Sequence, residues 1–470
     1  MISFDPFFNT ALLAISSAVL SGVFGYAIAP WLQTRKRSRR AVRTLWLLPF
    51  VLPAFLIGLV LLPLQQSIAL NSNFGMYWVL VAHVLMNSGY LASLIVANAP
   101  ERSVQESALL AGASKWQIRR FIELPYLLPS LAPGLLLVAL YSATSFGLVK
   151  TLGMGLNTLE TQIASAALRD LDLSLAGSLA VFQTTITVLM FLLARRLGRN
   201  SGTEIGAEDA GKLMRSRFGA LLAIAYSAAL ILLVLNVLAK SLAGPGLISN
   251  IANLGGLGTR DLLNISVLEA TANSLRNMLI SVSIALLVSW LLAKKRVLSF
   301  WALLPIGISP VVWGLGALII MGYLPRFISS SWLALPVLQS LFLIPLLYQL
   351  LQPARNRFSR DLRDAARSDG ASTLQIVRYL EIPILFPTIR IAISLGGLSA
   401  LGEFGAANFL AFGDQATLPI VLFRLISRPG TENFALAMTT ASLFILISAY
   451  VLWIANREVR TEHQVSPVGI

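Results

Sequence analysis

The stretch ESALLAGASKWQIRRFIELP, at residues 106–125, is repeated 258 residues later as DAARSDGASTLQIVRYLEIP at residues 364–383. Both copies read acid-x-Ala-x3-Gly-Ala-Ser-x2-Gln-Ile-x-Arg-x2-Glu-x-Pro, and from residue 106 to residue 129 the two copies agree at 11 of 24 positions. Each copy lies between long apolar stretches. The sequence therefore predicts a duplicated membrane protein whose halves present the same polar loop to the same side.

The composition of the chain also indicates a membrane protein. Hydrophobic residues make up 56% of the 470 residues and charged residues only 12%, about half of the usual charged share of a soluble protein. The chain has no cysteine and two histidines. This excludes disulfides, thiolate metal sites and cysteine nucleophiles, and we expect no metal site.

Apolar stretches long enough to cross a bilayer recur along the whole chain. The sequence predicts eleven spans, so the fold class is an all-α integral membrane protein. The predicted spans are 10–32, 44–64, 76–98, 128–149, 174–194, 218–240, 267–293, 299–322, 332–352, 384–402 and 433–455.

The net charge of +15 follows the predicted topology. Segments 33–43, 99–127, 195–217, 294–296, 353–390 and 456–470 hold 28 of the 36 Lys and Arg residues, and they alternate with segments poor in basic residues. The positive-inside rule places these basic segments in the cytoplasm, with the N-terminus outside and the C-terminus inside. We therefore expect membrane lipid, and no nucleic acid, as a partner. Ala27-Ile-Ala29 resembles a signal cleavage site, but no Lys or Arg precedes it, so we expect the first span to be retained.

The duplication extends beyond the loop. Phe146-Gly147 and Gly155 match Phe404-Gly405 and Gly413 at the same offset of 258. We divide the chain into a first repeat at 1–197 with five spans and a second at 218–470 with six. The polar loops lie at about 99–127 and 353–385, and a cytoplasmic linker at 198–217 joins the repeats. Because both loops face one side, the repeats are parallel, and a pathway would lie between them.

The repeated stretch carries a family resemblance. Acid-x-Ala-x3-Gly-x9-Ile-x-Leu-Pro is matched by Glu106, Ala108, Gly112, Ile122 and Leu124-Pro125, and more loosely by the second copy. It is similar to the EAA loop of the inner-membrane permease subunits of binding-protein-dependent ABC importers of the type I fold. The duplicated form resembles the thiamine and ferric-iron permeases over nearly the whole chain. The second copy departs from the pattern with Asp364 and Leu380.

The resemblance implies an ATP-driven importer of the bacterial inner membrane. Two copies of a cytosolic P-loop ATPase, which bind the ATP and Mg²⁺, would dock on the loops, and a periplasmic or lipid-anchored solute-binding protein would dock outside. The small Ala and Gly residues leave a bare backbone that a partner can approach, and the acids offer a charge to a partner Arg or Lys. The expected coupling residues are Glu106, Ala108, Gly112, Ala113, Asp364, Ala366, Gly370 and Ala371.

The chain itself shows no competent nucleotide site and no catalytic residues, so we expect a transport subunit rather than an enzyme. Gly206–Lys212 fits the first seven positions of a P-loop, but Leu213 replaces the Ser or Thr that ligates magnesium and no strand precedes the stretch. We interpret it as part of the linker. No cofactor is expected on this chain.

Polar residues within or at the edge of the membrane are the pathway candidates, because a central charge there costs about 2.5 to 3.5 kcal/mol. Glu403 and its repeat counterpart Ser145 form one such pair, and Lys150 and its counterpart Asn408 form another. Glu403 fits either a pathway role or helix-end capping. His83 and Asn87 share a helix face, where interhelical hydrogen bonding is favoured over ligand binding.

Sequence around Glu403 and around Thr158 looks more like thiamine permeases than iron ones, which favours thiamine or a related cation as the solute. Ferric iron, a polyamine or another small ion remains the alternative. From other classes, a secondary transporter driven by an ion gradient would also show parallel repeats, and a noncatalytic membrane scaffold is a third interpretation. Neither of these needs matched Ala/Gly loops that end in Pro.

Overall fold

The protein was analysed as a computed structural model, which describes residues 5–33, 39–68, 74–197, 213–242, 246–258, 263–293, 302–325, 332–357, 360–427 and 430–455. Within these ranges every regular element is a helix. Nine of the described helices are long and apolar enough to cross a membrane. These spans are 5–32, 75–97, 115–143, 173–197, 217–241, 267–292, 334–355, 373–401 and 431–453.

The two repeats share their elements in the same order, except that the described part of the second repeat has no counterpart of α2. The first repeat contains α1 (Asp5–Leu32), α2 (Arg39–Val51), α3 (Ala54–Ser67), α4 (Gly75–Ala97), α5 (Arg102–Leu110), α6 (Lys115–Ile118), α7 (Leu124–Ala143), α8 (Phe146–Leu152), α9 (Leu159–Leu168) and α10 (Leu173–Leu197). The second contains α13 (Val267–Leu292), α15 (Pro310–Gly322), α17 (Ala334–Arg357), α18 (Arg360–Ser368), α19 (Thr373–Ile376), α20 (Ile382–Leu401), α21 (Ala407–Leu410), α22 (Leu418–Ile426) and α23 (Thr431–Ala455). α7 and α20 both have 20 residues, and α10 and α23 both have 25, at the offset of 258.

Two of the eleven predicted spans, 44–64 and 299–322, are not single long helices. In the first repeat α2 and α3 meet at an angle of 98°. The break is at Pro53, whose ring cannot donate a hydrogen bond and which disfavours helical backbone in the residue before it. In the second repeat α15 has only 13 residues and begins at Pro310, after a short 3-10 turn at Leu304–Gly307. In both repeats, the predicted span is therefore interrupted next to a proline.

One further long helix, α11 (Arg217–Ser241), lies between the repeats in the chain, followed by the short α12 (Leu247–Ala252). α11 packs against α1 of the first repeat and against α23 of the second. Inside each repeat the pattern is shared, because α1 packs on α4 and α7 while α13 packs on α17 and α20. α11 is thus the helix that gives the second part of the chain its additional span.

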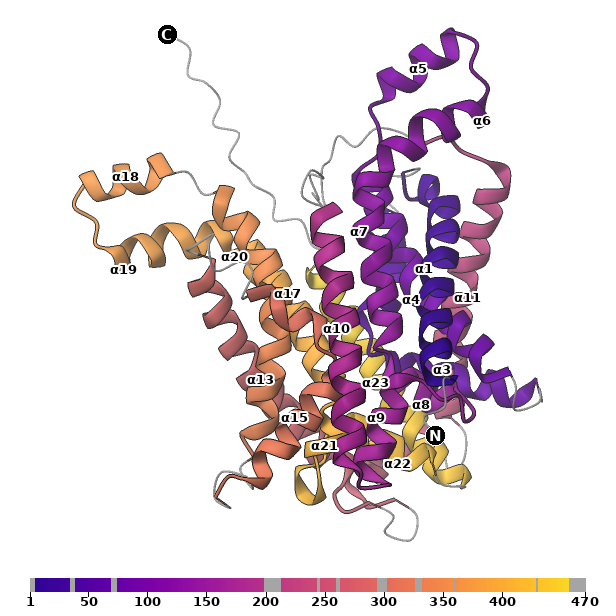
Figure 1. Ribbon diagram of the computed structural model, residues 1–470, viewed down its shortest axis with the longest axis vertical. Helices are drawn as coiled ribbons and strands as arrows, with labels where there is room; N and C mark the ends of the chain where they lie inside the picture. Colours follow the sequence, from indigo (N-terminus) through magenta and orange to yellow (C-terminus); the bar gives the residue numbers. More distant parts are fainter. Residues whose placement is uncertain are drawn as a thin grey trace.

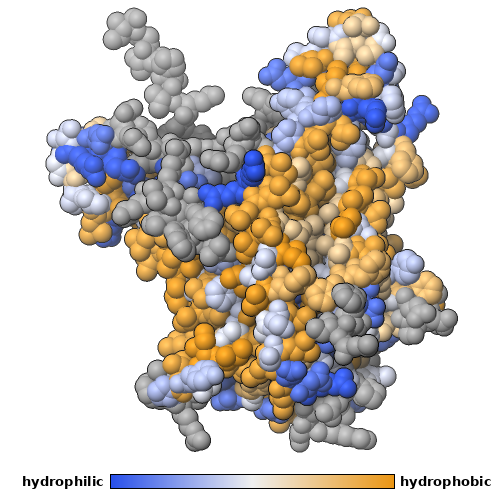
Figure 2. Space-filling model, in the orientation of Figure 1, coloured by the Kyte–Doolittle hydropathy of each residue, from blue (hydrophilic) through white to orange (hydrophobic). Residues whose placement is uncertain are grey.

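The polar loops of both repeats lie at the same end of the molecule. Figure 1 shows the hairpin α5–α6 at the top right and the hairpin α18–α19 on the left, lower down but still in the upper half of the molecule. Below them, hydrophobic residues cover the flank, as Figure 2 shows, while hydrophilic residues gather on the hairpins and near the lower end. This distribution is that of a protein whose middle faces lipid.

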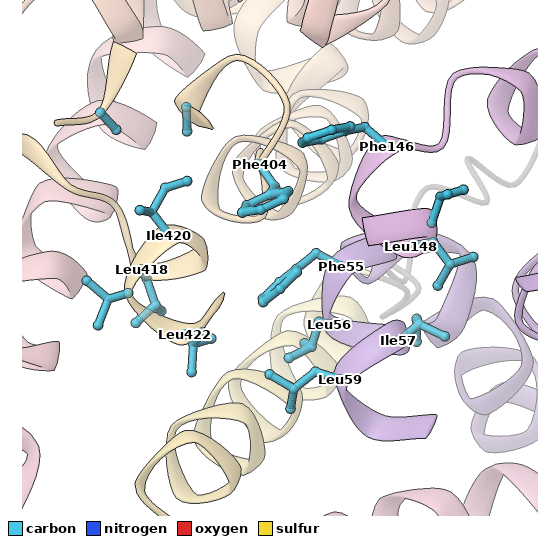
Figure 3. Packing of buried hydrophobic residues seen from close by; sticks show 14 of the residues in the cluster. Phe55, Leu56, Ile57, Leu59, Phe146, Leu148, Phe404, Leu418, Ile420 and Leu422 are labelled. Atoms are coloured by element: carbon cyan, nitrogen blue, oxygen red, sulfur yellow. The ribbon is translucent and has the colours of Figure 1, made fainter. Parts of the chain in front are cut away.

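The main hydrophobic core joins the repeats near the lower end. It contains Phe55 and Phe146 from the first repeat and Phe404 and Leu422 from the second, all of them buried. Figure 3 shows Phe404 between Phe146 and Phe55. The repeats are therefore in contact below and carry their hairpins apart from one another above.

Candidate functional site

Each hairpin turns on a glycine in the left-handed conformation. Gly112 follows α5 with φ +83°, and Gly370 follows α18 with the same φ. The Gly112 N–H donates to Leu109 O at 3.0 Å and the Ala113 N–H donates to Ala108 O at 3.0 Å. These are the two hydrogen bonds of a Schellman motif, and the second hairpin repeats them. The left-handed backbone therefore requires glycine at these two positions, in addition to the small size that the sequence analysis expected for the approach of a partner.

The Ser and Gln of the repeated motif start the second helix of each hairpin. The Ser114 N–H donates to Gln117 Oε1 at 2.7 Å, and the Gln117 N–H donates to Ser114 Oγ at 3.3 Å. Ser372 and Gln375 make the same pair of bonds at 2.8 and 3.3 Å. Each pair is a capping box, which fixes where the helix begins after the glycine turn.

The second helix of each hairpin continues into the membrane. A π-helical turn at Arg119–Glu123 leads from α6 into α7, and one at Val377–Glu381 leads from α19 into α20. Pro125 and Pro383 lie in the first turn of α7 and α20 and do not end the helix. Proline lacks an N–H, and the wider turn accommodates it without a break in the helix. In each repeat the second helix of the hairpin and the membrane helix therefore form one continuous helix.

The predicted coupling residues occupy equivalent places on the two hairpins. Glu106 and Gly112 are exposed on the first, as Asp364 and Gly370 are on the second. The four alanines of the set, namely Ala108, Ala113, Ala366 and Ala371, are half-buried. The structure thus presents both copies of the motif to solvent at one end of the protein.

Apolar side chains beside these residues are also open to solvent. Leu110 is 90% exposed on the first hairpin and Leu374 is 76% exposed on the second. Trp116 and Tyr379 are exposed as well. On the second hairpin, a shallow hollow of about 340 Å³ is lined by Gly370, Tyr379 and their neighbours Asp369, Ala371, Gln375, Ile376 and Leu380. Exposed apolar groups this far from the lipid-facing flank indicate a surface that a protein partner covers.

A buried glutamate lies at the base of the first hairpin. Glu123, the last residue of the π-helical turn, accepts hydrogen bonds from Tyr26 Oη at 2.8 Å and Gln105 Nε2 at 3.1 Å. It also accepts from the N–H of Met214, near the end of the linker, at 2.7 Å. Arg119 donates to Met214 O at 3.0 Å. The chain between the repeats is therefore held at this hairpin.

The equivalent Glu381 has charged partners. Arg355 donates to its Oε2 at 2.9 Å and Arg363 to its Oε1 at 2.6 Å. Arg355 also lies over the Trp290 ring, with the guanidinium carbon 4.9 Å from the ring centre. Among the described residues, salt bridges are thus found at Glu381, whereas the partners of Glu123 are a tyrosine, a glutamine and a backbone N–H.

The lower-end candidates do not form one polar cluster. The carboxylate of Glu403 is buried and accepts from the N–H groups of Ala406 at 2.6 Å and Ala407 at 3.0 Å. This geometry supports capping, and a role of its charge in the pathway stays a prediction. Ser145 is buried, Lys150 is exposed on α8 and Asn408 is half-buried on α21. His83 Nδ1 hydrogen-bonds Ser17 Oγ of α1 at 3.0 Å, which supports the interhelical interpretation.

One buried acid was missed in the sequence. Glu160 on α9 is fully buried and accepts a hydrogen bond from Gln183 on α10. Thr187, one turn further along α10, donates to the carbonyl of Gly307 in the second repeat. An acid inside an otherwise apolar protein was the available signal. The P-loop-like stretch 206–212 lies outside the described residues, as do 294–301 and the basic residues after 455.

Comparison with known proteins identifies a transport family. Residues 21–244 match the family described as the binding-protein-dependent transport system inner membrane component. The chain is 25% identical to a thiamine transport system permease protein of Haemophilus influenzae over 92% of this chain and 85% of that protein. It is also 25% identical to one of Brucella abortus over 94% of this chain and 86% of that protein. A molybdenum transport system permease of Haemophilus influenzae is 26% identical, over 42% of this chain and 93% of that protein.

Proposed function

Since the chain is a two-repeat permease of the binding-protein-dependent ABC importer type, we propose that it forms the membrane pathway of an importer whose ATPase binds the two hairpins. The matched pair of hairpins at one end is the observation that carries this proposal (Figure 1). Each hairpin offers exposed apolar side chains and an acid, and each continues without a break into a membrane helix. A force applied at the hairpin would therefore reach the membrane helix directly.

The hairpin end is proposed to be cytoplasmic. The basic residues around the hairpins, such as Arg120, Arg363 and Arg378, support this orientation through the positive-inside rule. The lower end, where α1 begins, would then face outward and receive a solute-binding protein. Two ATPase subunits that approach each other on ATP would draw the hairpins together and turn the repeats, so that the lower contact parts.

The proposed solute is thiamine or a related organic cation. The support is the extent of the resemblance, because the thiamine permeases match the chain over both repeats whereas the molybdenum and sulfate permeases match 42% and 36% of it. A ferric-iron or other small-ion permease is the alternative. An oxyanion is a further possible outcome of the uptake test.

The docking role is tested with Gly112→Trp and Gly370→Trp in the full transporter. Because no other atom lies within 4 Å of where a side chain would start at either glycine, the indole would project toward the partner. The expected result is a loss of uptake and of copurification of the ATPase, while the permease stays in the membrane. Gly155→Trp serves as the matched control, because Gly155 also has a positive φ of +90° and open space around it but lies between α8 and α9, away from the hairpins, so the ATPase should still copurify. Unchanged uptake with full recovery of the ATPase would contradict the docking role.

The solute is tested by uptake of radiolabelled thiamine into vesicles that contain the permease, its ATPase and its binding protein. ATP-dependent uptake that unlabelled thiamine competes away, and that ferric iron, molybdate and sulfate do not, is expected. Uptake of one of the inorganic ions instead would contradict the thiamine proposal and leave the importer proposal in place. ATP-independent uptake coupled to a proton or sodium gradient would contradict the importer proposal itself.

A further inference from the structure

Four phenylalanines from the two repeats meet near the lower end of the molecule. The Phe404 ring of the second repeat stacks on Phe146 of the first, with ring centres 5.6 Å apart and planes at 20°. It stacks on Phe55 of the first repeat at 4.9 Å and 21°, and it also contacts Phe423 at 5.3 Å. Figure 3 shows Phe404 between the other two rings. We call this contact between the repeats the phenylalanine stack.

The backbone around the stack is packed closely. A Cβ atom on Gly402 would lie 1.7 Å from Pro53 Cγ, at the break between α2 and α3 of the other repeat. One on Gly147 would lie 3.0 Å from Phe55 Cβ and 3.4 Å from Phe404 Cδ1. The stack therefore lies where the loop before α8 and the loop after α20 meet the break between α2 and α3. In a membrane protein such non-helical backbone is found only where it is buried in protein or lines a water-filled path.

Glu403 fixes the backbone that carries Phe404. Its two carboxylate oxygens accept from the N–H groups of Ala406 and Ala407, so the side chain spans the loop on which Phe404 sits. The carboxylate is buried, with 7% of the residue exposed. Hydrogen bonds from backbone N–H groups to a charged acceptor are stronger than neutral ones, and they hold better without competing water. The position of the Phe404 ring is therefore set by this side chain.

The equivalent loop of the first repeat lacks such a support. Ser145 stands where the second repeat has Glu403, and its side chain makes no capping hydrogen bond to α8. Its Oγ is buried and has no hydrogen-bond partner among the described residues. The loop that carries Phe146 is held by the Phe146 N–H to Thr144 O bond of 3.0 Å and by the Thr144 hydroxyl, which donates to Leu140 O at 3.0 Å, with no carboxylate across it. The two rings of the stack thus rest on one braced loop and one unbraced loop.

We propose that Glu403 is a positioning residue, which holds Phe404 as the fixed side of a closure between the repeats while the Phe146 loop is the side that moves. Its role is to place a ring rather than to attract a cation. This assignment depends on the proposed import function only for the identity of the solute that passes when the contact opens. The closure itself is a property of this chain.

The test uses the absence of cysteine from the native chain. Leu56 lies beside Phe55, is 2% exposed and faces Gly402 and Leu422 of the other repeat across a narrow apolar space. A single Leu56→Cys thiol therefore reports whether the contact is closed. The full-length variant is reconstituted alone in nanodiscs, and its reaction with a charged, membrane-impermeant thiol reagent is timed. Neither ATPase nor solute is needed, so the result is independent of the proposed function.

Adding Glu403→Ala is expected to speed thiol modification by about tenfold, since two hydrogen bonds are lost. Glu403→Gln keeps one accepting oxygen and is expected to give an intermediate rate. Phe404→Ala is expected to reproduce the effect of Glu403→Ala, and the double variant to add little, because both act on one ring. Ser145→Ala removes no capping bond and is expected to leave the rate unchanged.

Loss of packing in general is controlled by Glu123→Gln, which alters a buried acid at the opposite end of the protein. That change is expected to leave the Leu56→Cys thiol protected. If Glu403→Ala leaves the rate as it was, the positioning role is wrong. Equal acceleration by Glu123→Gln, or full additivity of Glu403→Ala and Phe404→Ala, would also overturn it. If Glu403→Ala does not fold, the intermediate rate expected for Glu403→Gln decides the question.

Discussion

The first hairpin, α5–α6, and the second, α18–α19, share their glycine turn, capping box and π-helical turn, yet they hold their buried glutamates differently. Glu123 takes hydrogen bonds from a tyrosine, a glutamine and the backbone of Met214. Glu381 takes them from two arginines. Identical backbone geometry therefore does not imply identical electrostatics. The fold places a glutamate acceptor at the same position in both repeats, whereas the groups that donate hydrogen bonds to it differ.

The donors differ at matched positions. Gln105 and Arg363 stand at the offset of 258 and both reach the glutamate of their own repeat. Arg355 matches Ala97, so the second arginine has no equivalent in the first repeat. Its place as a donor is taken by the Met214 N–H of the linker. The first hairpin is thus tied to the connection between the repeats, and the second is a self-contained ion cluster.

Glu381→Gln is expected to have the largest effect on this comparison. It removes the carboxylate that Arg355 and Arg363 share, and the Arg355 side chain is only 10% exposed. Loss of one partner of a buried ion pair costs about 3–5 kcal/mol. Thermal unfolding of the purified protein in detergent, followed by circular dichroism, should show a large fall in midpoint. A fall in the unfolding midpoint no larger than that caused by Glu123→Gln would mean that water solvates the two arginine side chains where they lie.

Glu123→Gln is expected to cost less, about 1–3 kcal/mol, because the partners left behind are neutral. The specific consequence is local. A neutral amide oxygen accepts more weakly than a carboxylate, so the bond from the Met214 N–H should weaken and loosen the segment around Leu213, whose own N–H donates to Gln33 Oε1 at 2.9 Å. Limited trypsin digestion should cut at Arg215 or Arg217 sooner than in the parent protein. Glu381→Gln is the matched control and should not speed that cut.

Gly112→Ala and Gly370→Ala are expected to cost about 1–2 kcal/mol each, since a side chain in the left-handed region is strained. The two effects should be equal, because φ is +83° at both positions. Asparagine tolerates this conformation better, so Gly112→Asn should unfold closer to the parent protein. If Gly112→Asn lowers uptake but unfolds like the parent protein, the small size of glycine is needed by the partner. If Gly112→Asn has both the uptake and the stability of the parent protein, the backbone conformation alone explains the glycine.

Arg363→Gln gives the second hairpin the side chain found at the matching place in the first. The smallest effect is expected here, about 1 kcal/mol, because Arg355 still faces Glu381 and glutamine can still donate. The double variant Arg363→Gln with Glu381→Gln should then be less unstable than the sum of the single changes. Strict additivity in the unfolding measurements would show that Arg363 and Glu381 do not interact.

Much of the architecture could be predicted from the sequence because it depends on local pattern. The repeated motif and the apolar stretches predicted the two repeats and nine of the long helices. The breaks at Pro53 and Pro310 were missed, although each proline lies inside a stretch that was taken as one span. Hydropathy averages over a window and does not register a turn of two residues. The capping boxes were also readable, since Ser-x2-Gln stands in both copies.

The partners of the buried glutamates could not be predicted. Tyr26 is 97 residues from Glu123 in the chain, and Met214 is 91 residues from it. Such contacts depend on how α1 and α11 pack, which no local pattern encodes. The same holds for Glu403. The sequence showed an acid where the other repeat has serine, but only the fold shows that its oxygens meet the N–H groups of Ala406 and Ala407.

The equal lengths of the paired elements have a mechanical consequence. From Glu106 to Leu197 and from Asp364 to Ala455 the two copies keep one offset, and α7 matches α20 as α10 matches α23. One inserted residue in either α7 or α20 would rotate everything beyond it by about 100° and displace it by about 1.5 Å. Substitutions have been tolerated at more than half of the positions in the motif, whereas a change of length would turn and shift one repeat and leave the other as it was. The two hairpins can therefore differ in sequence, but a change in the length of one repeat alone would end the match between them.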